Sequence, residues 1–131
     1  MHAQAILARV LGPCLKTMHA KRSAALLRAT AALLHGGITS LSSIALSLDG
    51  ETAYKHRIKS VDRLLGNTGL HLAFGELYRC IALRWLKDLP QILIVVDWSD
   101  LTRDQLWQLL RASVVVEGRS VTLYEEVHPQ R

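Results

Sequence analysis

The residues best suited to chemistry are the acids in the last third of the chain. Asp97 directly follows the apolar run Ile92 to Val96. Metal-assisted phosphoryl transfer needs several carboxylates on rigid elements, because Mg²⁺ takes oxygen ligands in near-octahedral geometry and two ions lie about 4 Å apart. The other acids nearby in the sequence or in the expected sheet are weak partners for this purpose: Asp100, Asp104, Glu125 and Glu126. An Asp at a strand end is also often a loop cap, so the pattern leaves both roles open for Asp97.

A second candidate site is a group of basic side chains between residues 55 and 63. At 100° per residue on a helix, four of them form one contiguous strip, here called the basic strip: Lys55, His56, Lys59 and Arg63. Arg57 lies beyond the strip and is a further candidate for DNA contact. Such a strip could neutralise phosphates or approach base edges in the major groove. Such a strip is also typical of the solvent-exposed face of an amphipathic helix. The absence of interleaved acids, apart from Asp62 at the margin of the strip, favours DNA.

Apolar periodicity predicts the helices that would carry the basic strip. We expect helices over residues 3–11, 16–34, a short segment ending near 48, a longer one ending at 65, and 70–85. Thr39 or Ser40 is the expected N-cap of the short helix and Thr52 that of the next one. With a turn at Asp49-Gly50 between them, these two helices predict a helix-turn-helix arrangement, and the longer helix should bury Tyr54, Ile58, Val61 and Leu65.

The periodicity then changes to that of strands. The run 92–96 is expected to be a strand buried on both faces, ending at Asp97. Segments 105–116 and 119–126 should form a hairpin about Glu117-Gly118. The expected cross-strand pairs are Val114 with Val121, Ser113 with Thr122, Ala112 with Leu123 and Arg111 with Tyr124. The fold class is therefore α+β, with a helical domain at 1–89 and a three-stranded antiparallel meander at 90–131.

Composition restricts the possible partners. Half of the 131 residues are hydrophobic, and residues 1–90 contain 12 Lys or Arg against 5 Asp or Glu, which favours a polyanion partner. Cys14 and Cys80 lie far apart without a CxxC motif, so we expect two reduced thiols. No charged leader or membrane-length apolar run is present, so the expected location is cytoplasmic, without membrane contact. No Walker loop or dinucleotide motif occurs.

Three motifs, in order along the chain, carry a family resemblance. They are KHRIKSVDRLLGN at 55–67, VDWSDL at 96–101, and LLRASV with GRSVTLYEE between 109 and 126. Together they resemble the beginning of the cut-and-paste transposases of bacterial insertion sequences, in the "insertion sequence four" family. The resemblance covers nearly the whole chain.

The resemblance implies that the helices bind double-stranded DNA at the terminal inverted repeats. It also implies that residues 90–131 begin a ribonuclease-H-like catalytic domain, in which an Asp-Asp-Glu triad binds Mg²⁺ or Mn²⁺ to cut and rejoin DNA. Asp97 matches the first acid, as catalytic residue and metal ligand. The second Asp and the Glu have no match here, so we expect a partial, nucleoid-associated transposase that is inactive alone. The alternatives are a non-catalytic module that competes at transposon ends and a decayed gene remnant.

Overall fold

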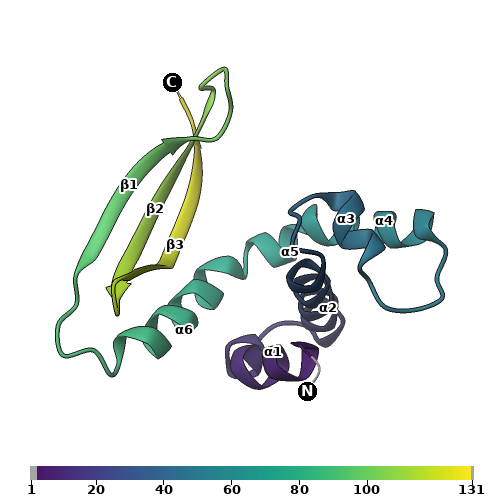
Figure 1. Ribbon diagram of the computed structural model, residues 1–131, viewed down its shortest axis with the longest axis horizontal. Coiled ribbons are helices and arrows are strands. Elements are labelled where there is room, and N and C mark those ends of the chain that lie inside the picture. The colour runs from purple at the N-terminus through teal and green to yellow at the C-terminus, as the bar shows by residue number, and fades with distance from the viewer. Residues whose placement is uncertain (1–2, 131) are drawn as a thin grey trace. The chain divides into compact units, whose positions relative to one another are not determined.

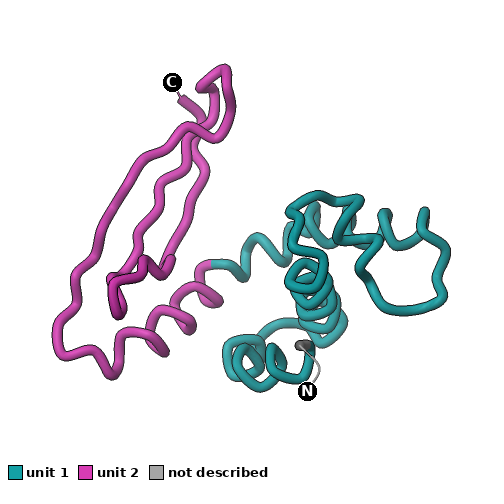
Figure 2. Tube along the Cα trace, in the orientation of Figure 1, with its two compact units in different colours: residues 1–74 teal, residues 75–131 magenta. Residues whose placement is uncertain are grey.

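The computed structural model describes residues 3–130 and divides into two compact units, Met1–Phe74 and Gly75–Arg131 (Figure 2). The first unit is helical. The second contains a helix and a three-stranded antiparallel sheet (Figure 1), so the α+β class is confirmed. The boundary between the units falls after residue 74 of the chain, so the last helix belongs with the sheet. The domain boundary expected at residues 89–90 places this helix with the other helices.

The first unit opens with two helices separated by a short 3₁₀ turn. The elements are α1 (Ala3–Leu11), η1 (Gly12–Leu15) and α2 (Ala20–Gly36). Pro13 lacks an N–H and ends the regular helix there. Helix α2 begins later than expected because His19 is its N-cap, with Nδ1 accepting a hydrogen bond from the Lys21 N–H at 3.3 Å. Gly37, at φ 66°, ends α2 in the left-handed conformation.

Helices α3 (Leu41–Leu46) and α4 (Tyr54–Leu65) form the expected short and long pair. Ser40 caps α3 by accepting a hydrogen bond from the Ser43 N–H at 3.1 Å. The expected Thr52 cap is wrong, because Ala53 is the N-cap residue of α4 and makes no side-chain bond. Side chains from α2, α3, the turn after it and α4 make the core of this unit: Ala32, Ala45, Leu48 and Val61, flanked by Leu41, Ile44 and Ile58.

The helix expected at 70–85 is divided in two. The structure has α5 (Thr68–His71) and α6 (Phe74–Leu86). Asn67 starts α5 early, since its Oδ1 accepts from the Leu70 N–H at 2.9 Å. The Ala73 N–H then bonds to the carbonyl three residues back, that of Leu70, at 3.0 Å. This tighter turn interrupts the regular α-helical bonding.

The sheet has the order β1-β2-β3, with β1 at Ile94–Asp100, β2 at Trp107–Val116 and β3 at Arg119–Pro129 (Figure 1). Glu117 and Gly118 have φ of 50° and 74°, as a tight hairpin turn requires. The pairs Val114–Val121 and Ser113–Thr122 are as expected. The next two predicted pairs are wrong: a β-bulge makes Leu123 an extra residue, so Ala112 pairs with Tyr124 and Arg111 with Glu125.

The prediction that the first strand is buried on both faces is also wrong. All seven residues of β1 are exposed, Val96 by 62%. The strand lies at the edge of the sheet, and among the described strands it pairs with β2 alone. A continuous apolar run is typical of strands covered on both sides, but here the run occupies an edge strand.

The cysteines and the lengths of the helices bear on two other expectations. Neither cysteine is a free thiol among the described residues, so the expectation of two reduced thiols is wrong. Separation along the sequence and the lack of a CxxC motif therefore did not indicate the redox state of either cysteine. Within residues 3–130, every helix is too short or too polar to traverse a bilayer.

Candidate functional site

Asp97 lies in the middle of β1 rather than at its end. The pairing with β2 continues beyond it to Asp100, which faces Gln108. Asp97 itself faces Arg111, and Arg111 faces Glu125 on β3. Directly opposed residues of antiparallel strands project on the same face, so these three side chains form a row across the sheet.

The Glu125 carboxylate in this row is already engaged. Its Oε1 forms an ion pair with Nε of Arg111 at 2.6 Å, and its Oε2 accepts a hydrogen bond from the Tyr78 hydroxyl at 3.3 Å. Tyr78 comes from α6 and packs edge-on against Tyr124, with ring centroids 5.8 Å apart. Partial burial, followed by the nearby Glu125 charge, raises the pKa of Tyr78 above 10.0. Glu125 is therefore a structural partner of two side chains.

Two acids that follow Asp97 in the sequence, Asp100 and Asp104, hold local structure. Asp100 accepts hydrogen bonds from the side-chain amides of Gln105 at 3.0 Å and Gln108 at 3.4 Å. Asp104 accepts from the Leu106 N–H at 3.2 Å, and its pKa is lowered mainly by a side-chain hydrogen bond with Thr102. Asp104 is therefore a loop cap, whereas Asp100 is held by two side-chain amides.

Asp97 differs from both of these acids. It is exposed, and within the described chain its carboxylate forms neither a hydrogen bond nor an ion pair with another residue. A loop cap would accept a nearby backbone N–H, so the cap interpretation does not fit Asp97. Residues 3–130 contain no group of three or more His, Cys, Asp or Glu side chains that could hold a metal. Asp97 is therefore one carboxylate without the companions that a divalent cation needs.

All four residues of the basic strip are exposed on α4. None of them forms a salt bridge with any residue in the described range. The buried side of the helix consists of Val61 and Leu64, with Ile58 packed against the core. Leu65, expected on that side, is 53% exposed. The strip thus remains available to an anionic partner.

Arg57, the fifth DNA-binding candidate, has a role in the fold. Its side chain is half-buried, and Nη1 donates hydrogen bonds to the carbonyl oxygens of Leu48 at 2.9 Å and Leu46 at 3.4 Å. These carbonyls lie at and just beyond the C-terminus of α3, where backbone acceptors lack helical partners. Arg57 therefore links the end of α3 to α4 by hydrogen bonds. The spacing of residues within α4 could not indicate this contact, because its acceptors belong to another segment.

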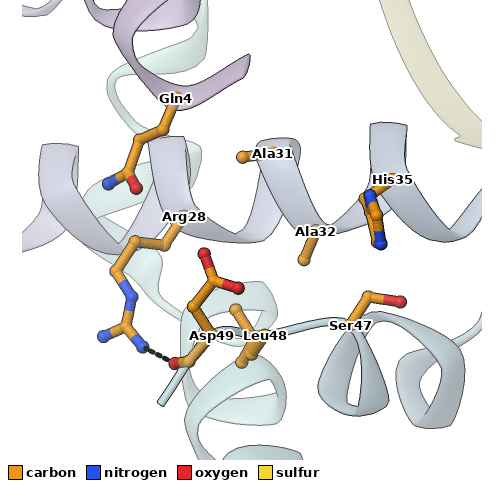
Figure 3. Close-up of a pocket in the computed structure, with 8 residues that line it drawn as sticks. All are labelled: Gln4, Arg28, Ala31, Ala32, His35, Ser47, Leu48 and Asp49. Carbon is orange, nitrogen blue, oxygen red and sulfur yellow. Dashed lines mark hydrogen bonds between the residues drawn. The ribbon is translucent and has the colours of Figure 1, made fainter. Parts of the chain in front are cut away.

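A pocket of about 260 Å³ lies between α1, α2 and the turn after α3 (Figure 3). Its polar lining includes Gln4, Arg28, His35 and Asp49. Arg28 donates from Nη2 to the Asp49 carbonyl oxygen at 3.1 Å, which fixes the turn at Asp49-Gly50. The sequence did not indicate this pocket, and its residues come from segments that only the fold brings together.

No protein-family model matches the chain, and neither a curated protein nor a solved structure matches it. The resemblance to transposases therefore rests on the three sequence motifs alone.

Proposed function

We propose that this chain binds double-stranded DNA through α4, as the N-terminal part of a cut-and-paste transposase of the "insertion sequence four" family. The observation that supports this best is the basic strip: four exposed side chains without acidic partners, on a helix whose opposite side packs in the core of its unit. Lys and Arg side chains in such an array gain free energy by releasing the counterions condensed on DNA phosphates.

The sheet is proposed as the opening strands of a ribonuclease-H-like catalytic domain, with Asp97 as the first of three acids. In the complete enzyme these acids would hold Mg²⁺ or Mn²⁺. The residues of this chain do not fit a complete metal site, because Glu125 is bound by Arg111 and Tyr78 and Asp100 by two glutamines. We therefore expect no DNA cleavage by these 131 residues alone.

Fluorescence anisotropy with a labelled duplex tests the DNA-binding proposal. The double variant Lys55→Ala/Lys59→Ala should bind more weakly, with a slope of log K against log salt smaller by about 1.8, since each lost phosphate contact removes about 0.9. Arg84→Ala/Lys87→Ala makes the same charge change outside the strip and is the control. Equal weakening in both variants would mean that only net charge matters and would overturn the assignment to α4.

A second candidate is a non-catalytic module that occupies transposon ends, and the engaged state of Glu125 and Asp100 favours it. Incubation of the purified chain with supercoiled plasmid and Mg²⁺ distinguishes the candidates in one direction. If the chain nicks the plasmid and Asp97→Ala abolishes the nicking, the chain is not a non-catalytic module, and the expectation that it is inactive alone is wrong. The third, a decayed remnant, would lose support if the chain melts cooperatively.

A further inference from the structure

A basic hollow of about 250 Å³ lies between the start of α2 and the end of α4. Its residues come from two helices and the segment after α4, which spacing along the sequence does not bring together. The residues that matter for its chemistry are His19, Lys21, Arg22, Ser60, Arg63 and Asn67. We call it the α2–α4 hollow. An adjoining hollow shares Arg22, Arg63 and Asn67 and adds Asp62 and Gly69, so one acid lies at the margin.

The three permanent cations of the hollow make no polar contact with the rest of the described chain. Within residues 3–130, the side chains of Lys21, Arg22 and Arg63 form neither hydrogen bonds nor salt bridges, and the buried Nε of Arg22 has no partner. Three like charges around one hollow repel one another, and an anion placed among them removes that repulsion. Guanidinium groups and an ammonium group together are the donors that proteins use for phosphate.

The position of Arg22 is set by a glycine. Its guanidinium lies against the backbone of Gly69 in α5, so closely that a Cβ at residue 69 would stand 2.7 Å from Cζ. Gly69 is in a helical segment and has no left-handed φ, so its lack of a side chain serves the close approach rather than the backbone conformation. A methyl group there would displace the guanidinium while keeping the charge.

We propose that the α2–α4 hollow binds a phosphate group of the DNA backbone. This inference rests on the proposed DNA binding by α4. Arg63 belongs both to the basic strip and to the hollow, so the same duplex that lies along α4 can place a phosphate beside Lys21 and Arg22. The hollow extends the DNA-binding surface from α4 onto α2 and fixes how the duplex lies on the unit.

The test uses the full chain, a labelled duplex and anisotropy over a range of salt concentrations. Lys21→Ala should lower affinity roughly threefold to tenfold and the salt slope by about 0.9. Gly69→Ala should lower affinity about twofold to fivefold without any loss of charge, because the guanidinium loses its position. Lys21→Arg, which keeps the positive charge, should bind about as tightly as the unchanged chain. Arg9→Ala, which removes an exposed charge outside the hollow, is the matched control and should bind as the unchanged chain does.

The outcomes separate this inference from the proposed function. Normal binding by the Lys21→Ala and Gly69→Ala variants, with weakened binding by Lys55→Ala/Lys59→Ala, would overturn the hollow alone. Absence of DNA binding by the unchanged chain would overturn both. Calorimetric titration with inorganic phosphate covers the other source of this anion: saturable binding that Lys21→Ala removes, without any change in DNA affinity, would overturn the assignment to the DNA backbone.

Discussion

Replacing Arg57 by Met should destabilise the protein and identify this residue as structural rather than DNA-binding. Met retains much of the aliphatic length of the side chain but none of its hydrogen-bond donors. The change therefore removes the bonds to the carbonyl oxygens of Leu48 and Leu46. It leaves two backbone acceptors at the end of α3 without this partner.

The expected loss can be estimated from the two bonds. A hydrogen bond from a charged donor contributes about 1.5–3 kcal/mol, and an exposed one contributes less. The Leu48 bond is 2.9 Å long and partly buried, whereas the Leu46 bond is 3.4 Å long and exposed. The first should dominate, so we expect a loss of about 2 kcal/mol in the free energy of unfolding, roughly a 30-fold change in the equilibrium constant.

Urea unfolding followed by far-ultraviolet circular dichroism measures this loss. The matched control is Lys59→Met, which removes the charge and the donors of an exposed side chain on the same helix that has no hydrogen-bond or salt-bridge partner within residues 3–130. It should cost less than about 0.5 kcal/mol but weaken DNA binding. Equal, small losses of stability in both variants would refute the structural role. Weaker DNA binding by Arg57→Met than by Lys59→Met, with stability intact, would return Arg57 to the interface.

Three further predictions concern the core, a tyrosine and the sheet edge. Val61, 2% exposed, joins the core of the first unit, so Val61→Ala should lower the free energy of unfolding by about 2 kcal/mol, whereas the half-exposed Val10→Ala should change it little; urea unfolding measures both. Glu125→Gln should lower the pKa of Tyr78 towards 10.0 without reaching it, because burial is the larger cause, and ultraviolet absorbance of the tyrosinate measures this. Since the folded-state pKa of Tyr78 is raised, its contribution to stability is complete below pH 10.0 and is lost as the pH rises beyond that value, less steeply in Glu125→Gln. The exposed edge strand β1 should let copies of the chain associate at high concentration, and Val96→Lys should reduce this association because a charged residue on an edge strand opposes pairing between sheets. Light scattering measures the association, and an equal signal from both proteins would show that it does not proceed through β1.

The helices and the hairpin turn were predictable because their signals are local. Ser40 before an apolar segment marks the start of α3, and Gly37 and Pro13 mark ends of helical segments. Glu117-Gly118 between two alternating runs fixes the hairpin and its first four pairs. Each of these features depends on residues within a few positions of one another.

The remaining features depend on contacts that sequence spacing does not contain. Alternation with a period of two gives no sign of the extra residue at Leu123, so the predicted register fails beyond the bulge. The apolar composition of β1 suggests burial, but its exposure depends on which elements cover its faces; β3 is an edge strand too, and it buries Leu123. The basic strip was visible as a helical pattern, whereas Arg57 and the α2–α4 hollow depend on tertiary packing.

The bulge also changes how Asp97 should be understood. Without it, Arg111 would face Tyr124 and could turn its charge towards Asp97, its neighbour on β1. With it, Arg111 faces Glu125 and is held by an ion pair of 2.6 Å. Within residues 3–130, Asp97 is then the member of the row whose carboxylate has no side-chain partner, while Asp104 caps the nearby loop and Asp100 accepts from two glutamine side chains. The described part of the fold therefore leaves the Asp97 carboxylate unengaged, which the role proposed for it as a metal-binding acid requires.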